Sequence, residues 1–318
     1  MNSRTSSVEE VYSFNSNGSP RQRIPEDCNP INCSLGKCHI EEWPRHHLRE
    51  NKDDRGDKYY EKLCAVEQIG QGGFGKIYLG HKYIQTQEEG IQTTQRKKCT
   101  EKLLAIKVCN SRKEFDVQKK LKDNPYIVTP IKCFKTKKDE YVPELGKIVK
   151  EYVIAMEYCS NGDLVTFFQD PRNEQKIGCP KTAGTIVKHI VEGLKALDGI
   201  GYFHRDIKAN NVFVDSSKNF KLGDFGLVAS KDEINIIQCG IPTAMAPEMD
   251  GKYPPYDNKV DVWSLGILFY KLLYGLASHP FDPKNDKSES EIVKQIRSTS
   301  PETSFDFQSI NNSRYLIV

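Results

Sequence analysis

The stretch HRDIKANNVFV, residues 204–214, decides the fold of this chain, and KLGDFG follows it at residues 221–226. The first motif carries an acid at Asp206 and an amide at Asn211, and the second carries another acid at Asp224. Such a set can handle a hydroxyl proton and bind magnesium ions, because a hard cation prefers oxygen ligands. Two short strands, NVFV and FKLGDF, are predicted beside the acids and would place them on neighbouring turns.

The composition indicates a globular protein. A chain of 318 residues suffices for two domains or one bilobal unit, and 37% hydrophobic residues can form a buried core. Its 46 basic and 43 acidic residues are interspersed, so the net charge of +3 does not indicate nucleic-acid binding. No apolar run reaches the roughly 18 to 20 residues of a membrane span, and the amino terminus lacks a signal peptide. We therefore expect a cytoplasmic or nuclear protein with reduced cysteines and no membrane partner.

Residues 1–55 are rich in Ser, Asn, Arg and Pro without sustained periodicity, which predicts a mostly disordered extension. Within it Cys28, Cys33 and Cys38 recur every five residues, with histidines just after them. A small zinc site is one interpretation of this pattern. Paired zinc ligands usually stand about two to four residues apart, so the interpretation without a metal is favoured.

A glycine-rich hairpin is predicted at residues 62–84, where a strand, a GxGxxG turn and a second strand follow one another. A dinucleotide site would need a helix to begin at the last glycine, but β-branched and aromatic residues follow it instead. Such a hairpin can fold over phosphates, because no Cβ keeps its amides from the oxygens. An ordinary flexible hairpin is the structural alternative.

A lysine inside a buried strand is the next signal. The polar insert at residues 85–102 is predicted to be an exposed hairpin loop, and the strand LLAIKVC with Lys107 follows it. A buried lysine needs an anionic partner unless it reaches water at the strand edge. Glu114, in a predicted short helix, is the natural partner. Ser111 and Glu114 also read as a capping box, and both roles stay open.

The rest of the chain is predicted to contain two more strands and then mainly helices. IKCF and YVIAMEYC form the strands around a charged loop, and SNGDL breaks the second one and starts a helix. A long helix at residues 181–203 has an apolar face of 3.6-residue period. VDVWSLGILFYKLLYG, residues 260–275, is apolar on nearly every side and predicts a buried central helix. The apolar face of the long helix consists of Ile186, Val187, Ile190, Val191, Leu194 and Leu197.

Taken in order, GxGxxG, AIK, MEYCSNGDL, HRDIKANN, DFG, APE and DVWSLG resemble the eukaryotic-type protein kinases over residues 61–298. The resemblance implies an α+β bilobal fold within a kinase domain at 56–318. A small β-rich N-lobe would span about 61–158, and a larger, mainly helical C-lobe about 162–318. It also implies transfer of the γ-phosphate of ATP to Ser or Thr hydroxyls of a protein substrate, with Mg²⁺.

The resemblance implies catalytic roles for Asp206, Lys208, Lys107 and Glu114, and metal-binding roles for Asn211 and Asp224. Asp206 would accept or orient the substrate hydroxyl, and Lys208 would lie against the γ-phosphate. Asn211 and Asp224 would ligate magnesium through oxygen. A lysine two residues after the catalytic acid resembles the serine/threonine branch of the family, which is why Ser and Thr are the expected acceptors.

The resemblance also implies a nucleotide pocket. Lys107, paired with Glu114, would hold the α- and β-phosphate oxygens of ATP. The other residues implied to contact ATP are Gly70, Gly72 and Gly75 over the phosphates, Ile69, Ile77 and Ala105 above and Phe213 below the adenine, Met156 at the back, Glu157 and Cys159 at the adenine edge through their backbone, and Asp163 at the ribose.

The sequence departs from the family pattern around its catalytic centre. Lys107 and Glu114 are closer in sequence than the family usually has them. Ile241 stands where a threonine usually bridges the catalytic acid and lysine, which favours a second hypothesis, an ATP-binding pseudokinase-like scaffold. Ser230 and Thr243 are the only hydroxyls between Gly226 and Ala246, so we expect activation without loop phosphorylation.

The carboxyl end is the other departure. Only 43 residues follow Gly275, and they predict one helix with a capping box of Ser288 and Glu291. The family's last helices, with the arginine that pairs with Glu248, are expected to be missing. Arg314 is a substitute only by elimination. A small-molecule phosphotransferase is a third hypothesis, against which APE and DVWSLG argue.

Overall fold

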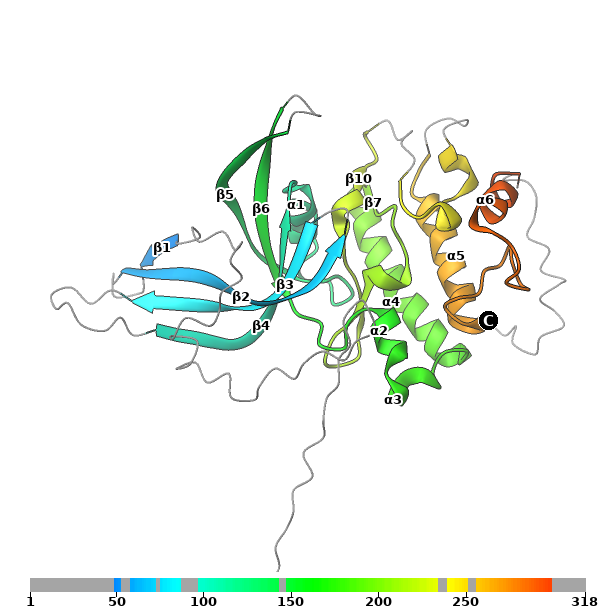
Figure 1. The fold of residues 1–318 in the computed structure, drawn as a ribbon, viewed down its shortest axis with the longest axis horizontal. Helices are drawn as coiled ribbons and strands as arrows, with labels where there is room; N and C mark the ends of the chain where they lie inside the picture. Colours follow the sequence, from blue (N-terminus) through cyan, green and yellow to red (C-terminus); the bar gives the residue numbers. More distant parts are fainter. Residues whose placement is uncertain are drawn as a thin grey trace, which may run out of the picture. The chain divides into compact units, whose positions relative to one another are not determined.

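The computed structural model describes residues 49–52, 58–72, 75–86, 97–142, 147–233, 239–250 and 256–298 (Figure 1). Contacts divide the chain into two compact units. The first comprises Met1–Asn110 and Lys132–Tyr158, and the second comprises Ser111–Ile131 and Cys159–Val318. The cysteines Cys28, Cys33 and Cys38 and the residue Arg314 lie outside the described residues.

The first unit is built on a six-stranded sheet with the order β1-β2-β3-β4-β6-β5. The pairs β1–β2, β2–β3, β3–β4 and β4–β6 are antiparallel. The predicted glycine-rich hairpin is confirmed, because its two strands pair up to Gly72 and Gly75. The strands are β1 (Arg49–Lys52), β2 (Lys58–Gly72), β3 (Gly75–Thr86), β4 (Lys97–Cys109), β5 (Pro130–Val142) and β6 (Lys147–Glu157).

The strands of this sheet run further than the sequence pattern indicated. Strand β3 continues to Thr86, β4 begins at Lys97, and Gln85 pairs with Lys97. The prediction of a loop at residues 85–102 is therefore wrong at both ends, while residues 87–96 lie outside the described ones. The ladder joins backbone groups, so polar side chains do not end it. Likewise β1 shows that part of the predicted extension at 1–55 is a strand.

The core of the first unit lies on one face of the sheet. Successive side chains of a strand point to opposite faces, and directly paired residues share a face. The buried cluster accordingly comes from alternate positions on three neighbouring strands, and these residues are Tyr78, Leu104, Ile106, Val153 and Ala155.

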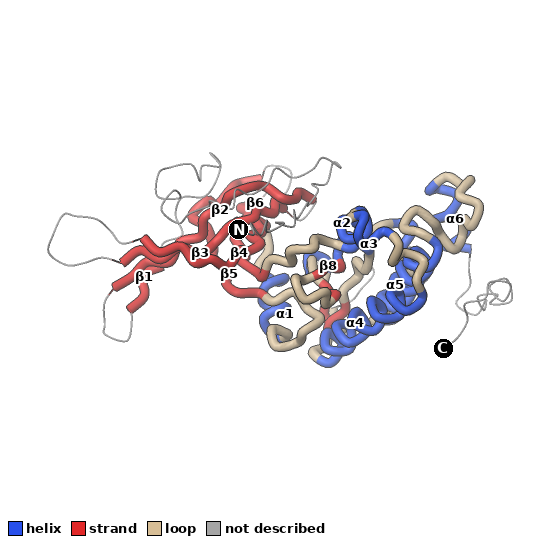
Figure 2. The backbone as a smooth tube through the Cα atoms, turned by 90° about the horizontal axis from the view of Figure 1, so that it is seen from below, coloured by secondary structure: helices blue, strands red, loops and turns tan. Residues whose placement is uncertain are grey.

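The second unit is mainly helical, as expected (Figure 2). Helices α4 and α5 pack together, and α4 also covers β9. Two small sheets pair β7 with β10 and β8 with β9, which confirms the two short strands predicted beside the acids. The elements are α1 (Lys113–Lys120), α2 (Leu164–Gln169), α3 (Pro171–Glu174), α4 (Pro180–Gly199), β7 (Tyr202–Phe203), β8 (Val212–Val214), β9 (Phe220–Leu222), β10 (Ala229–Ser230), α5 (Lys259–Tyr274) and α6 (Glu289–Ser298).

Helix α1 belongs to the second unit through the segment that follows it. The backbone of Val128 donates to Leu222 O at 2.9 Å, and Leu222 N donates to Tyr126 O at 2.8 Å. The helix starts one residue later than the predicted capping box implies. Its N-cap is Arg112, while the Ser111 hydroxyl accepts from Lys113 N at 3.2 Å.

Helix α5 is buried on only part of its circumference. Val262 is 64% exposed, Phe269 37% and Tyr274 46%, so the prediction of burial on nearly every side is wrong for these positions. The predicted capping box of α6 is confirmed, because Ser288 N donates to Glu291 Oε2 at 2.8 Å. Across the described ranges, no helix is both long and apolar enough to span a membrane.

Candidate active site

The loop between β7 and β8 brings together two predicted catalytic residues, Asp206 and Lys208, and one predicted metal ligand, Asn211. Asp206 is 5% exposed. Its Oδ2 accepts hydrogen bonds from Lys208 Nζ and from Asn211 Nδ2, both at 2.8 Å. Asn211 Nδ2 also donates to the main-chain oxygen of Asp206 at 2.8 Å. One carboxylate oxygen is thus held by a charged and a neutral donor, and the side chain is fixed in orientation.

A buried acid on α5 anchors the start of this loop. Asp261 accepts from the main-chain N–H of His204 and of Arg205, each at 2.7 Å. Burial raises the pKa of the Asp261 carboxyl, against the lowering effect of His204, its largest opposing neighbour, and of Arg205. Asp261 was not among the residues predicted from the sequence. Its signal was an acid inside an apolar helical run, which is costly to bury without partners.

The His204 ring links the loop to the DFG motif. Its Nδ1 accepts from Asp206 N at 3.3 Å, so its Nε2 carries the proton and donates to Gly223 O at 3.1 Å. Phe225 is buried and meets the same ring edge-on, with centroids 5.0 Å apart. The imidazole therefore acts as a structural bridge inside the core.

Arg205 connects the loop to two later segments. Its backbone has φ of +70°, a left-handed conformation that a non-glycine residue adopts at a cost. Its Nε donates to Leu227 O at 2.7 Å, and its Nη1 donates to the Tyr256 hydroxyl at 3.1 Å. The strained backbone is held by Asp261 on one side and by these contacts on the other.

The predicted metal ligands are joined through a single glycine. Gly223 N donates to Asn211 O at 2.9 Å, and Asp224 follows with φ of +55°. A Cβ on Gly223 would lie 2.8 Å from ring carbons of Phe213, so only glycine fits there. The link brings the backbones of Asn211 and Asp224 close to each other.

The donor chemistry at this point suits a hard cation. The Asn211 amide nitrogen is occupied by Asp206, and no described residue donates to its Oδ1. That oxygen, with the Asp224 carboxylate, offers the ligand type that Mg²⁺ prefers. Within the described ranges, no group of three or more His, Cys, Asp and Glu side chains could hold a metal ion. Any cation here would therefore complete its coordination from phosphate and water.

The segment at Gly240 lies over Asp206. Gly240 has φ of +95°, and a Cβ there would come within 2.9 Å of Arg205 O and 3.7 Å of Asp206 Oδ1. The next residue, Ile241, is 38% exposed. Because Lys208 reaches Asp206 directly, this contact does not need a hydroxyl at position 241.

Several predicted nucleotide residues share one face of the sheet in the first unit. Ile77 pairs with Lys107, Ala105 pairs with Met156, and Gly70 pairs with Ile77. Since Lys107 and Ala105 are two residues apart on β4, their side chains point the same way. This is the face opposite the core cluster, and Lys107 is only 3% exposed on it. The register of the sheet therefore gathers these predicted residues on one face of the first unit.

The three glycines of the hairpin are not equivalent. Gly75 has φ of +134°, and a Cβ there would lie 1.9 Å from Val108 O. At Gly70 the nearest atom to a Cβ is 3.7 Å away, and at Gly72 no atom lies within 4 Å. The fold requires glycine at 75, while 70 and 72 have room for a side chain.

The remaining predicted residues divide between the units. Ile69 and Glu157 lie in the first unit, while Glu114 and Cys159 lie in the second and are buried. The pairing of Lys107 with Glu114 stays a prediction. Asp163 caps α2 by accepting from Thr166 N at 2.8 Å. It also forms a β-bridge with Phe213, so these two predicted residues are neighbours.

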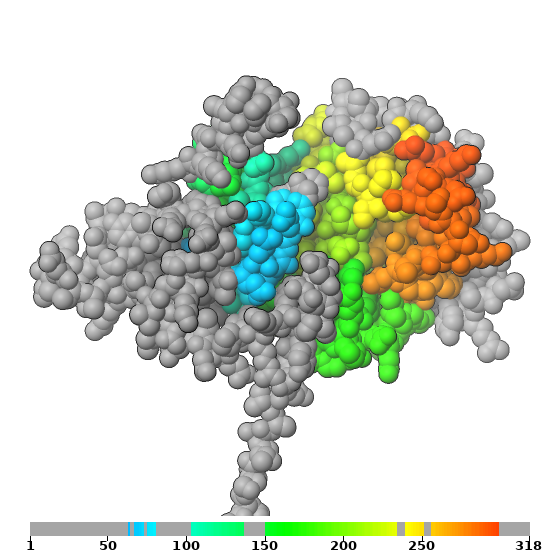
Figure 3. All heavy atoms as spheres, in the orientation of Figure 1, coloured from blue at the N-terminus to red at the C-terminus, as the bar shows by residue number. Residues whose placement is uncertain are grey.

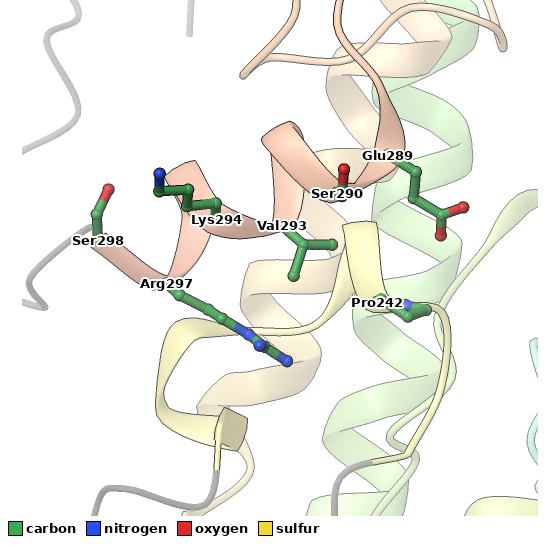
Figure 4. Close-up of a pocket in the computed structure, with 7 residues that line it drawn as sticks. All are labelled: Pro242, Glu289, Ser290, Val293, Lys294, Arg297 and Ser298. Atoms are coloured by element: carbon green, nitrogen blue, oxygen red, sulfur yellow. The ribbon is translucent and has the colours of Figure 1, made fainter.

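A surface groove of about 760 Å³ lies between α6 and the segment near residue 242 (Figure 4). On the surface, α6 in orange-red lies beside the yellow segment near residue 242 (Figure 3). None of the predicted site residues lines it. Arg297 forms one wall and its Nε lies 2.8 Å from Asp250 Oδ1. The lining residues are Pro242, Glu289, Ser290, Val293, Lys294, Arg297 and Ser298.

Comparison with known proteins finds one matching family, and the similar proteins named below are all kinases. Residues 63–314 match the family described as "Protein kinase domain". The chain is 30% identical over 256 residues to the probable cell cycle serine/threonine-protein kinase CDC5 homolog of Encephalitozoon cuniculi, covering 77% of this chain and 48% of that protein. Against NUAK family SNF1-like kinase 1 of Mus musculus, identity is 28% over 256 residues, covering 80% and 34%. Against maternal embryonic leucine zipper kinase of Xenopus laevis, identity is 30% over 237 residues, covering 72% and 32%. The chain spans about half or less of the length of these curated relatives.

Proposed function

This chain belongs to the protein kinase family, and from this premise we propose that it transfers the γ-phosphate of ATP to Ser and Thr hydroxyls of protein substrates. The observation that carries the proposal is the convergence of Lys208 and Asn211 on one oxygen of Asp206. Phosphoryl transfer needs positioning and charge neutralisation more than covalent chemistry, and this loop supplies both.

Asp206 acts on the acceptor hydroxyl in this proposal. Its Oδ2 is occupied by the two donors, and its Oδ1 accepts no hydrogen bond from a described residue. That oxygen takes the hydroxyl proton or orients the hydroxyl. Lys208 offers its charge to the transferring group while remaining in contact with the acid.

Asn211 and Asp224 hold magnesium in this proposal. Bound Mg²⁺ supplies positive charge that neutralises the phosphate oxygens. The chain contributes the fixed amide of Asn211, whose nitrogen is engaged by Asp206, and the left-handed turn at Asp224. Both features orient oxygen ligands before the nucleotide binds.

The first unit contributes the nucleotide contacts. Lys107, buried on the face that Ile77, Ala105 and Met156 share, holds phosphate oxygens, and the apolar neighbours contact the adenine. A buried ammonium group needs an anionic partner, which ATP supplies together with a carboxylate such as Glu114.

Serine and threonine are the proposed acceptors because of Lys208, and the names of two relatives support this choice. One is called a serine/threonine-protein kinase in Encephalitozoon cuniculi and another in Saccharomyces cerevisiae. A scaffold that binds ATP without transfer is the second candidate, favoured by the exposed Ile241 at the position of the usual threonine.

One experiment separates the two. Purified wild type and Asp206→Asn are incubated with labelled ATP, Mg²⁺ and a mixed pool of Ser, Thr and Tyr peptides. We expect transfer to Ser and Thr peptides by wild type and a loss of about a thousandfold in the variant. Circular dichroism checks that both are folded. A folded wild type with no signal above Asp206→Asn would support the scaffold instead.

A further inference from the structure

A long-range ion pair joins α1 to the segment that follows the DFG motif. Lys113 Nζ lies 2.8 Å from Glu233 Oε1 and 3.1 Å from Glu233 Oε2. The two residues are 120 positions apart in sequence and belong to the same unit. One ammonium group thus contacts both oxygens of one carboxylate.

The pair closes a segment that is already held at its other end. Helix α1 packs against the short helical turn Phe225–Leu227, directly after Asp224. Strand β10 then pairs with β7, and Glu233 N donates to Ser230 O at 3.2 Å. The segment from Asp224 to Glu233 therefore touches α1 at the start and is tied to it again at the end.

Glu233 also lies in the field of the catalytic loop. The pKa of its carboxyl is lowered, mainly by Lys113 and to a smaller extent by Arg205. Arg205 precedes Asp206 and donates to Leu227 O, inside the same segment. The Glu233 carboxylate thus contacts the cation of α1, and the charge of Arg205 in the catalytic loop acts on it in the same direction.

We propose that Glu233 is a positioning residue. Through its ion pair with Lys113, it holds the segment from Asp224 to Glu233 in the geometry required for catalysis, with a negative charge that the sequence itself supplies. The proposal rests on the proposed kinase activity and deepens it, because it concerns how the same site is kept active. Ser230 pairs with Tyr202 in β10, and its main-chain oxygen accepts from Glu233 N at the turn that follows. The Glu233 carboxylate supplies negative charge to this segment without modification of the Ser230 hydroxyl.

The expected effect on kcat follows from the solvent exposure of the two paired side chains. The Lys113 side chain is 41% exposed and that of Glu233 51%. An ion pair at this exposure is weak and screened by salt, so Glu233→Gln is expected to lower kcat by about three- to fivefold. The loss should shrink in high salt, because the wild type then loses the same contact.

The test is a charge swap in the full chain. Wild type, Lys113→Glu, Glu233→Lys and the double swap are compared for kcat, for KM of ATP and for KM of peptide. The matched control is Glu192→Lys, which breaks the exposed pair with Lys195 on α4 (2.9 Å). Phosphatase-treated wild type is measured beside them.

Each single reversal is expected to lower kcat about tenfold, and the double swap to recover to within about threefold of wild type. The control and the phosphatase treatment should leave kcat unchanged. A double swap no better than the worse single variant would overturn the proposal, as would an equal loss in Glu192→Lys or a loss of activity after phosphatase treatment.

Hydrogen exchange separates this proposal from the proposed function. Amides of residues 225–230 are expected to exchange faster in each single reversal and to regain protection in the double swap. If wild type transfers no phosphate above Asp206→Asn, the proposed function fails, while this pattern still supports the ion pair. Unchanged exchange in all variants contradicts the ion pair whether or not the enzyme is active.

Discussion

Lys208 Nζ donates directly to Asp206 Oδ2 at 2.8 Å, without a bridging side chain from the segment at Gly240. The acid and the lysine are two residues apart and are held by the same loop. Asn211 also donates to the Asp206 carboxylate, so the orientation of this side chain depends on two other residues of the same loop. The isoleucine at 241 consequently does not remove the contact on which the proposed chemistry depends.

We therefore expect Ile241→Thr to change kcat by less than about threefold. Lys208→Ala should lower kcat by about a hundredfold, because it removes a charged donor at the reacting centre. Steady-state transfer of labelled phosphate measures both. A gain of about tenfold or more in Ile241→Thr would show instead that the missing hydroxyl limits the natural enzyme.

Substitutions at two glycines of the hairpin should affect different properties, stability at Gly75 and ATP binding at Gly72. Gly75→Ala places a Cβ against Val108 O, so we expect a loss of about 2–4 kcal/mol in the free energy of unfolding. Gly72→Ala meets no atom within 4 Å and should stay within about 1 kcal/mol of wild type. Its KM for ATP should nevertheless rise about tenfold, because a methyl group keeps the backbone from the phosphates. Urea denaturation measures the stability of both variants, and steady-state kinetics measures their KM for ATP. An unchanged KM for ATP in Gly72→Ala would indicate that the hairpin has a purely structural role.

Asp261 is expected to couple stability and activity. Asp261→Asn keeps the shape but leaves an amide N–H facing the backbone N–H of His204 or Arg205. We expect a loss of about 2–4 kcal/mol in the free energy of unfolding together with reduced transfer. The control is Asp123→Asn, at an exposed position, which should change neither the free energy of unfolding nor phosphate transfer. Equal stability of the two variants would contradict the anchoring role.

His279 should contribute a pH dependence to stability. Burial lowers its pKa, with Lys271 acting in the same direction and Thr243 O and Asp282 opposing. The unfolded chain then binds a proton at a higher pH than the folded one. Stability should therefore fall as the pH drops through 6.5, the ordinary pKa of histidine.

His279→Gln removes this titration while an amide N–H can still donate to Thr243 O. The slope of the free energy of unfolding between about pH 7 and pH 5.5 should be shallower in the variant. Chemical denaturation across that range is the measurement. Identical slopes in both proteins would show that His279 does not titrate differently on folding.

The motifs predicted much of this fold because they combine local signals with special residue types. The hairpin, the strands beside Asp206 and Asp224, and the amphipathic helix α4 were confirmed. The predicted end of that helix at residue 203 was wrong, because α4 ends at Gly199 and Tyr202–Phe203 form β7. The family match agrees with the predicted α+β bilobal class. The residue roles at the nucleotide remain predictions.

Other features depend on long-range pairing that a local pattern does not contain. The ladder between Gln85 and Lys97 is formed by backbone groups, and its polar side chains predicted a loop. The exposed side of α5 at Val262 and Phe269 was hidden by its apolar composition. Glu233 could not be recognised because its partner, Lys113, is 120 residues away.

Among the described residues, Asp261 accepts hydrogen bonds from main-chain N–H groups alone, those of His204 and Arg205, and every residue type except proline offers such a group. Backbone N–H groups thus anchor the loop to α5, while the side chains of Asp206, Lys208 and Asn211 supply its proposed chemistry. A substitution that replaces the reactive carboxylate of Asp206 therefore leaves the hydrogen bonds between Asp261 and the loop backbone in place. A change at Asp206 is therefore expected to alter the chemistry and leave the anchor in place, whereas a change at Asp261 affects both.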